Sequence, residues 1–320
     1  MPRLGILGTL VLDRIHPPPG EAGDVEPTRD WGGLLYALES FEAAREDDWT
    51  FLPIAKVGAD VYEEAVGRVE TLSGVASLAG LRRVPEANNR VELHYHDAGD
   101  RCERLTGGVP GWRWPELEPL VAGCDALYVN FIAGWELDLA AARALRRGFG
   151  GRIYCDVHSL LLGVDATGVR VRRPLPDRDA WVECFDWLQG NAPEIALVSG
   201  EDDPLEGVRR LVARGAEAAF CTLGPAGAAW ASADGEGRLE APDPPGLADG
   251  RERSDRAVDP TGCGDAWGAA CVATLLAGRG VRAAVRRANR FGAATAGHRG
   301  TAGLSRVLGG LAPAPGGSVR

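Results

Sequence analysis

The sequence lacks several features on which common protein classes depend. Among its 35 basic residues only Lys56 is a lysine, so it cannot contain the phosphate-binding loop G-x-x-x-x-G-K-[ST], which needs a lysine beside its last glycine. The first apolar segment, "GILGTLVLD", does not have the G-x-G-x-x-G spacing of a dinucleotide-binding dehydrogenase. No apolar run approaches the roughly 20 residues that a membrane-spanning helix needs.

Positive charge is also outweighed by negative charge. The formal net charge is −10 and the sequence pI is about 5.1, whereas proteins that neutralise nucleic-acid phosphates are usually basic. We therefore expect no nucleic-acid partner. The N-terminal stretch "MPRLGILGTLVLD" lacks a basic region followed by a small-residue cleavage site, which favours a cytoplasmic protein with no membrane association.

The seven cysteines form no C-x-x-C pair, and several lie inside apolar runs such as "IYCDV" and "AFCTLG". An odd count without close pairs is typical of small buried side chains in a reducing compartment. The five histidines are equally dispersed. A zinc site, which needs clustered cysteine and histidine, is therefore not expected.

Apolar runs and amphipathic stretches alternate along most of the chain. The pattern predicts a first strand over residues 4–10, a helix over 32–45, a strand over 49–58 and a helix after Asp60. Farther along, "AWVECFDWLQGN" is expected to be helical and the apolar "IALVSG" to be a strand. Such alternation indicates an α/β fold with a mostly parallel central sheet flanked by helices on both faces.

Three segments depart from this alternation. Residues 89–105 alternate apolar and polar positions around a turn at 97–100, which predicts a hairpin. Residues 233–256 are rich in proline, glycine and charge, which indicates a loop or an irregular hairpin. The tail, residues 312–320, is expected to be disordered.

The stretch "VDPTGCGDAWGAACVATLLAG", Val258–Gly278, carries the clearest chemistry. A helix that begins at Gly262, Cys263 and Gly264 exposes unpaired N–H groups and the positive end of its dipole, and glycine lets a phosphate approach them. Asp265 in the first turn could accept a proton from an attacking hydroxyl. The simpler alternative is that Asp265 only caps a glycine-rich turn.

"DPTGCGD" resembles the D-[T/P]-x-G-A-G-D signature of the ribokinase-like (PfkB) carbohydrate kinase family. Five further stretches resemble that family's motifs in the same order along nearly the whole chain: "GTLVLD", "WGGLLYAL", "KVGADVYEE", "NAPE" and "CTLGPAGAAW". "ANRFGAATAGHRG" also resembles the family's C-terminal helix beside the adenine. The resemblance implies a single ribokinase-like domain over residues 1–320, with a small β-lid formed by segments near 10–32 and 88–108.

The resemblance also implies an ATP-dependent kinase that needs Mg²⁺ and phosphorylates a hydroxyl, expected to be primary, of a sugar or sugar-containing small molecule. Asp265 would be the general base, assisted by Gly262, Cys263 and Gly264. The other implied site residues are Asp13, Gly32 and Gly33 for the substrate, Asn191, Thr222, Gly224 and Gly227 for the nucleotide, Glu194 for Mg²⁺, and Asp259 and Thr261 for a monovalent cation such as K⁺.

Simpler roles exist for several of these residues. Asp13 could cap a turn, Gly32 and Gly33 could only start a helix, Glu194 could be a solvated helix residue, and Asp259 could only end a strand before Pro260.

Departures from the family pattern fall mainly on the acceptor side. Ala37 stands where the family usually has an asparagine, and His158 replaces the asparagine of D-x-N-x-R, whose arginine is missing. Cys263 replaces an alanine, which changes little because backbone N–H groups do the expected work. Loss of the asparagine suggests an acceptor with an apolar part against Ala37 and Leu34.

Phosphoryl transfer is thus better supported than the acceptor's identity. A nucleoside kinase on the same fold and a catalytically inactive sugar-binding or regulatory protein stay open as alternatives. The resemblance also allows a homodimer formed through the lid.

Overall fold

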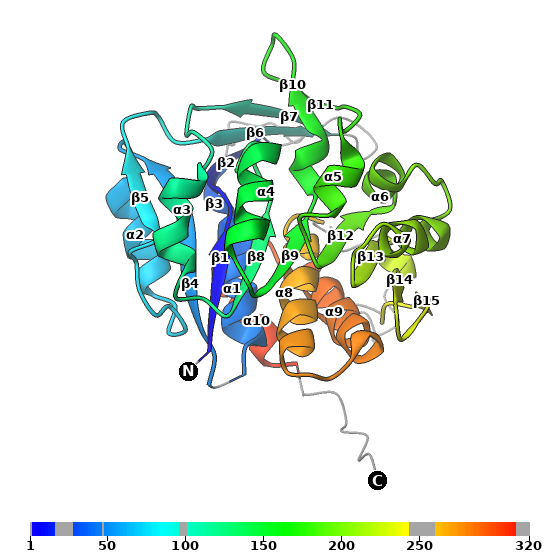
Figure 1. Ribbon diagram of the computed structural model, residues 1–320. Helices are drawn as coiled ribbons and strands as arrows, with labels where there is room; N and C mark the ends of the chain where they lie inside the picture. Colours follow the sequence, from blue (N-terminus) through cyan, green and yellow to red (C-terminus); the bar gives the residue numbers. More distant parts are fainter. Residues whose placement is uncertain (1, 17–27, 47, 96–100, 243–259, 312–320) are drawn as a thin grey trace.

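A nine-stranded sheet forms the centre of the computed structural model (Figure 1), which describes residues 2–16, 28–46, 48–95, 101–242 and 260–311. The predicted tail, residues 312–320, lies outside these ranges. In sheet order the strands are β15 (Gly235–Leu239), β14 (Ala228–Ser232), β13 (Ala218–Thr222), β12 (Trp187–Asn191), β9 (Arg152–Asp156), β8 (Ala126–Asn130), β1 (Arg3–Leu7), β4 (Thr50–Gly58) and β5 (Leu81–Val84). Pairing is parallel from β5 to β13 and antiparallel for β14 and β15. The predicted α/β fold class is confirmed.

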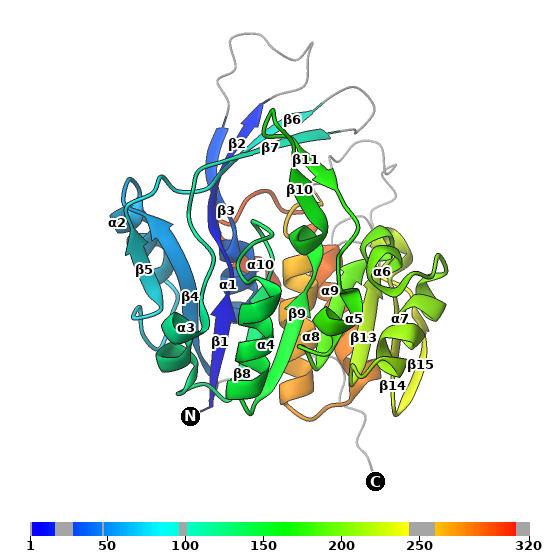
Figure 2. The same cartoon turned by 45° about the horizontal axis from the view of Figure 1, so that its top comes forward.

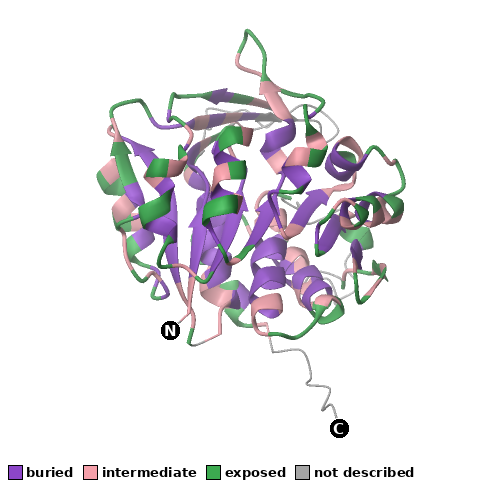
Figure 3. Cartoon of the chain, viewed as in Figure 1, coloured by how far each residue is buried: buried purple, intermediate pink, exposed green. Residues whose placement is uncertain are grey.

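Helices cover both faces of this sheet, because strand side chains point alternately to opposite sides and both faces are apolar. One buried cluster holds Tyr128 and Tyr154, and the other holds Leu127 and Ile153. The first cluster includes residues of α1 (Leu34–Ala44), α2 (Tyr62–Glu70), α8 (Cys263–Leu276), α9 (Val281–Thr295) and α10 (Leu304–Gly309). The second includes residues of α3 (Trp114–Val121), α4 (Leu139–Gly148), α5 (Arg178–Val182), α6 (Ala192–Ser199) and α7 (Pro204–Ala213). Figure 3 shows the buried strands between half-exposed helices.

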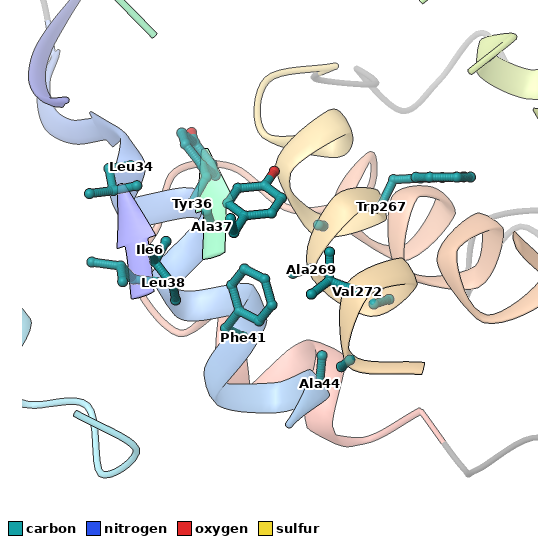
Figure 4. Packing of buried hydrophobic residues seen from close by; sticks show 14 of the residues in the cluster. Ile6, Leu34, Tyr36, Ala37, Leu38, Phe41, Ala44, Trp267, Ala269 and Val272 are labelled. Carbon is teal, nitrogen blue, oxygen red and sulfur yellow. The ribbon is translucent and has the colours of Figure 1, made fainter. Parts of the chain in front are cut away.

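The small residues of α8 let this helix approach the sheet closely. A Cβ added at Gly268 would lie 2.6 Å from Gln189 Oε1 and 2.7 Å from Tyr128 Oη. Ala269 is fully buried (Figure 4). Phe41 of α1 packs edge-on against Tyr128 with ring centroids 5.2 Å apart. The alanine- and glycine-rich sequence thus brings the N-terminus of α8 against the ends of the central strands.

The strand expected over residues 4–10 is interrupted. β1 ends at Leu7, and β2 (Leu10–His16) begins after a break at Gly8 and Thr9, where the N–H of Gly8 bonds to Ile54 and the carbonyl of Thr9 accepts from Leu34. Apolar residues stand on both sides of Gly8 and Thr9, so the sequence pattern hides the break. Asp13 therefore lies within β2, outside the central sheet.

A second sheet of four strands lies over the carboxyl ends of the central strands (Figure 2). Its order is β3 (Thr28–Gly33), β2, β6 (Arg90–Tyr95) and β7 (Arg101–Thr106), and β6 pairs antiparallel with β7 as the hairpin predicted over residues 89–105. We call this sheet the lid sheet. Whether it moves, and whether two copies pair through it, stay predictions.

A short hairpin that sequence analysis did not predict reaches the lid sheet. β10 (Leu162–Val164) and β11 (Arg170–Arg172) pair antiparallel, and Val169 bridges to Arg104 of β7. This hairpin follows the 3₁₀ helix η2 (His158–Leu161) directly after β9. It connects the central sheet to the lid sheet at one side of the space between them.

The expectation of a strand at "IALVSG" is wrong. The strand is β12, and Ile195 to Ser199 belong to α6. Asn191 caps this helix: its side chain accepts from the N–H of Glu194, whose carboxylate in turn accepts from the N–H of Asn191. A short apolar run does not distinguish strand from helix by periodicity, whereas this capping box does.

The structure bears on two further expectations from composition. Within the described part of the chain, no helix is long and apolar enough to cross a membrane. Among the described cysteines, Cys155, Cys184, Cys221 and Cys271 are buried.

Candidate active site

A cavity of about 380 Å³ lies between the carboxyl ends of the central strands and the lid sheet. Open α/β sheets bind ligands at this edge. The predicted site residues that line the cavity are Asp13, Gly33, Asn191, Glu194, Thr222, Gly224, Thr261, Gly262, Cys263, Gly264 and Asp265. Residues from both halves of the chain therefore meet in one place.

The N-terminus of α8 faces this cavity. Gly262 is its N-cap with φ of 77°, and a Cβ there would lie 2.1 Å from the ring of Tyr36, so only glycine fits. At Gly264 the nearest atom to an added Cβ is 3.6 Å away. The first-turn N–H groups of a helix have no carbonyl of their own helix to bond. This end of α8 can therefore receive an anion.

Asp265 lies in the first turn of α8 and is held by a residue from β8. Asn130 Nδ2 donates to Asp265 Oδ1 over 2.5 Å. Burial raises the pKa of Asp265 to about 6, against the lowering effects of the Asn130 hydrogen bond and the nearby His158. Asp265 is thus a carboxylate near neutral pH that can take up a proton, which suits a general base.

The start of α8 is tied to two strands by a polar network. Gln189 of β12 donates through Nε2 to Asp156 Oδ2 and to the carbonyl of Gly264, each over 3.0 Å. Tyr154 of β9 donates to Gln189 Oε1 over 2.5 Å. Burial raises the pKa of Asp156, and the carboxylates of Glu194 and Asp265 raise it further. This network fixes the anion-binding end of α8 relative to the sheet.

Glu194 is buried and engaged in three hydrogen bonds. His158 Nδ1 lies 2.7 Å from its Oε1, Asn191 Nδ2 donates to the same oxygen over 2.8 Å, and the N–H of Asn191 donates to Oε2 over 2.7 Å. Although burial favours neutral forms of both residues, their attraction lowers the pKa of Glu194 and raises that of His158. Sequence analysis noted His158 as a departure but gave it no role.

Glu194 Oε1 already accepts two hydrogen bonds and Oε2 accepts one. One lone pair of Oε2 therefore remains to bind Mg²⁺. Carboxylate oxygen is the ligand class that Mg²⁺ prefers, and this ion usually keeps several waters and phosphate oxygens. Among the described residues, no group of three or more histidine, cysteine, aspartate or glutamate side chains could hold a metal. A magnesium ion here would depend on the donor's phosphates.

The lid side of the cavity has a polar part and an apolar part. The carboxylate of Asp13 lies directly over Gly32, where an added Cβ would be 1.9 Å from Asp13 Oδ2. Gly33 has φ of 58° and turns the chain from β3 into α1. Beside them the cavity is lined by four aliphatic side chains, those of Val11, Val91, Leu93 and Ile132.

The expected contact of an acceptor with Ala37 and Leu34 is wrong. Both side chains are fully buried in the core between α1 and the central sheet (Figure 4), and neither lines the cavity. Helix α1 turns this face toward the central sheet. The apolar wall belongs instead to the lid sheet and to Ile132 after β8.

The expected nucleotide residues separate into two groups. Asn191, Thr222 and Gly224 line the cavity, but Gly227 does not. Gly227 has φ of 95°, and an added Cβ would lie 2.0 Å from the carbonyl oxygen of Leu239, so it serves the turn between η3 (Gly224–Ala226) and β14. Thr261 lines the cavity, whereas Asp259 lies outside the described residues.

Several cavity residues were missed by sequence analysis, namely Asn130, Asp156, Gln189, Glu103 and Arg170. Asn130 and Asp156 each end an apolar strand of a parallel sheet, a position that could have identified them. No comparable signal marks Arg170, since its hairpin was not predicted.

The chain resembles known proteins in part of its sequence and in its fold. The model of the pfkB family carbohydrate kinases matches residues 168–306, a little under half of the chain. A search of curated protein sequences gives no significant match.

Three solved structures illustrate the similarity of fold. A putative ribokinase II from Escherichia coli in complex with ATP and Mg²⁺ is 19% identical, with a TM-score of 0.72 over 96% of this chain and 98% of that one. A Thermotoga maritima ribokinase is 15% identical, with a TM-score of 0.69 over 96% and 97%. A Burkholderia thailandensis nucleoside kinase bound to inosine is 17% identical, with a TM-score of 0.70 over 95% and 93%.

These findings confirm the resemblance to the ribokinase-like (PfkB) family that the motifs indicated. The chain has the fold of that family's carbohydrate and nucleoside kinases, with a mostly parallel sheet flanked by helices.

Proposed function

We propose that this protein is an ATP-dependent kinase that transfers the γ-phosphate to a hydroxyl, expected to be primary, of a sugar or a sugar-containing small molecule. One observation carries the proposal: Asp265, with its pKa raised to about 6, lies at the glycine-framed N-terminus of α8 in a cavity that also contains Asp13. A base, an anion site and a hydroxyl-binding carboxylate are thus combined.

In the proposed reaction Asp265 takes the proton of the acceptor hydroxyl. The hydroxyl oxygen forms a bond to the γ-phosphorus, the bond from that phosphorus to the β–γ bridging oxygen breaks, and ADP leaves with the electron pair. N–H groups at the start of α8 would stabilise the negative charge on the transferring phosphoryl oxygens. Asn130 would keep Asp265 oriented and ionised through its hydrogen bond.

Magnesium would supply positive charge to the donor phosphates. Glu194 is its expected protein contact, directly or through water, since its carboxylate is held in place by His158 and Asn191. Thr222 and Gly224 at the end of β13 would lie beside the nucleotide. A monovalent cation near Thr261 stays part of the proposal.

The acceptor would lie under the lid sheet, between Asp13 and the end of α8. A lid that covers the acceptor excludes water, which otherwise competes as a phosphoryl acceptor. A sugar or a nucleoside would occupy this position, and the apolar lid residues favour acceptors larger or less polar than plain ribose or fructose.

A phosphorylation screen tests the proposal. Purified protein is incubated with ATP, Mg²⁺ and a panel of sugars and nucleosides, and both ADP and phosphorylated product are measured. The Asp265→Asn variant, prepared in parallel, controls for contaminating kinases. Acceptor-dependent ADP release that is lost in the variant supports the proposal. Binding of an acceptor without any phosphorylated product would favour the inactive sugar-binding alternative instead.

A further inference from the structure

His158 lies beside Glu194, the carboxylate expected to contact Mg²⁺. It is the first residue of η2, directly after β9, and its N–H donates to Asp156 Oδ1 over 3.2 Å. The residue lines the cavity, and 43% of its side chain is exposed. Its Nδ1 lies 2.7 Å from Glu194 Oε1. The imidazole is therefore held at the cavity wall by its backbone and by one side-chain hydrogen bond.

The partners of Glu194 identify which nitrogen of His158 carries a proton. Nδ2 and the backbone N–H of Asn191 both donate to the Glu194 carboxylate. The Asn191 amide is oriented, because its Oδ1 accepts from the N–H of Glu194. An ionised carboxylate only accepts hydrogen bonds, so Nδ1 of His158 is a donor. This hydrogen bond is the same whether or not Nε2 also carries a proton.

Glu194 has little capacity left for a metal ion. Its two oxygens together offer about four lone pairs. Two on Oε1 and one on Oε2 accept from His158 and Asn191. Only Oε2 can therefore bind an ion or one of its waters. Without the His158 donor, Oε1 would regain a lone pair, and the carboxylate could hold one ion through both oxygens.

Divalent cations differ in how they use such a carboxylate. Mg²⁺ keeps several waters in a strict octahedral arrangement, whereas Ca²⁺ takes about six to eight oxygen ligands and often both oxygens of one carboxylate. A carboxylate with a single free lone pair therefore suits Mg²⁺ better than Ca²⁺. Within the described part of the chain, no group of three or more histidine, cysteine, aspartate or glutamate side chains could supply the missing ligands.

We infer that His158 is a positioning residue that restricts Glu194 to one bond with a metal ion and so selects Mg²⁺ over Ca²⁺ for the donor nucleotide. The inference rests on the proposed function, because the ion is expected together with the phosphates of ATP. Asparagine carries its Nδ2 the same number of bonds from the backbone as Nδ1 of histidine. It can therefore make the same hydrogen bond to Glu194, whereas leucine cannot.

Arg146 of α4 provides a matched control for a purely structural loss. Its Nη1 donates over 2.7 Å to Oδ2 of Asp186, whose side chain is only 16% exposed. The same oxygen accepts from the N–H of Ile153, at the end of β9 away from His158. Neither Arg146 nor Asp186 lines the cavity. Arg146→Leu therefore removes a donor from a largely buried carboxylate without changing the proposed metal contact.

The experiment measures binding of the non-hydrolysable ATP analogue AMP-PNP by titration calorimetry, without acceptor, in Mg²⁺ or in Ca²⁺. We expect the wild type to bind AMP-PNP more tightly in Mg²⁺. His158→Leu should weaken binding in Mg²⁺ by about 10-fold, as for loss of a residue that orients a metal ligand. Its binding in Ca²⁺ should stay within about twofold, because the freed oxygen offsets the lost orientation. His158→Asn and Arg146→Leu should keep the wild-type ratio of the two affinities.

The ratio of the AMP-PNP affinities in Mg²⁺ and Ca²⁺ decides the test. An unchanged ratio in folded His158→Leu overturns the inference, and so does a wild type that does not distinguish the two ions. An equal fall of the ratio in His158→Asn or in Arg146→Leu also overturns it. If His158→Leu does not fold, His158→Ala replaces it. A wild type that binds AMP-PNP in neither ion overturns the proposed function, and the inference with it.

Discussion

The two walls of the cavity are built in different ways. The core wall consists of strand ends and the first turn of α8, where Asn130, Gln189 and Asp265 are fixed by short hydrogen bonds to one another or to the backbone. The lid wall consists of single side chains from separate short strands, Asp13 from β2 and Arg170 from β11, above an aliphatic surface.

This difference separates two tasks. Stabilising a transferring phosphoryl group needs backbone N–H groups and a base in fixed positions, which the start of a helix packed on a parallel sheet supplies. Selecting an acceptor needs side chains whose identity can change without disturbing that helix. We therefore expect substitutions in the core wall to affect the rate of transfer, and those in the lid wall to affect the use of the acceptor.

The largest expected effect is on the core wall. Asp265→Asn removes the proposed base but keeps the size of the side chain, so kcat should fall by about 10²- to 10⁴-fold, the contribution typical of a positioned base. ATP affinity, measured by titration calorimetry, should change little. A kcat within a few-fold of the wild type would show that another group removes the proton.

The corresponding change on the lid wall is Asp13→Ala. A carboxylate accepts strong hydrogen bonds from hydroxyls, so its loss should lower kcat/KM for the acceptor by about 1.5–3 kcal/mol in transition-state free energy. ATP binding should be spared, which is the contrast with a defect in the core wall. Steady-state kinetics over the acceptor panel measures the kcat/KM for the acceptor and the KM for ATP. Unaltered acceptor kinetics would show that Asp13 does not bind the acceptor.

Sequence alone predicted the first turn of α8 in the core wall and Asp13 in the lid wall, but it missed Asn130 and Gln189 in the first and Arg170 in the second. Gly262, Gly264 and Asp265 are contiguous, and their residue types follow from the chemistry at one helix start, so a local motif sufficed. Arg170 forms an ion pair with Glu103, which lies 67 positions earlier in the sequence. Arg170 belongs to a hairpin of two three-residue strands, and the second strand, β11, has an arginine at each end. Such strands have no periodicity from which a contact could be inferred.

The fold shows the same limit. Alternation of strands and helices was sufficient for the parallel sheet, because it reflects burial on both faces. The break between β1 and β2 was hidden because Leu7, Leu10 and Val11 are all buried, in the central or in the lid sheet. An apolar pattern records burial and not which sheet a strand joins.

Two glycines within the core wall allow a sharper test of its construction. Gly262→Ala should lower the free energy of unfolding by about 1–3 kcal/mol, because φ of 77° is strained for alanine and its Cβ would meet Tyr36. Gly264→Ala, where the nearest atom is 3.6 Å away, should leave that free energy unchanged or slightly raised but lower kcat. Urea unfolding measures the stability of both variants, and steady-state kinetics measures their kcat. Equal destabilisation of the two variants would contradict the difference in space and in φ between Gly262 and Gly264.

The smallest expected effect concerns how the core wall tunes its own base. Since Asp265 must be ionised to accept a proton and its pKa is raised to about 6, kcat/KM should fall as pH drops through about 6 and level off above it. The Asn130 hydrogen bond favours the ionised form, so Asn130→Ala should move this acid limb to higher pH by about one unit, the shift that 1.36 kcal/mol produces. If the acid side of the pH profile does not move while the maximal kcat/KM falls, Asn130 contacts the acceptor and does not change the pKa of Asp265. Asn130 would then help to select the acceptor, as the lid wall does.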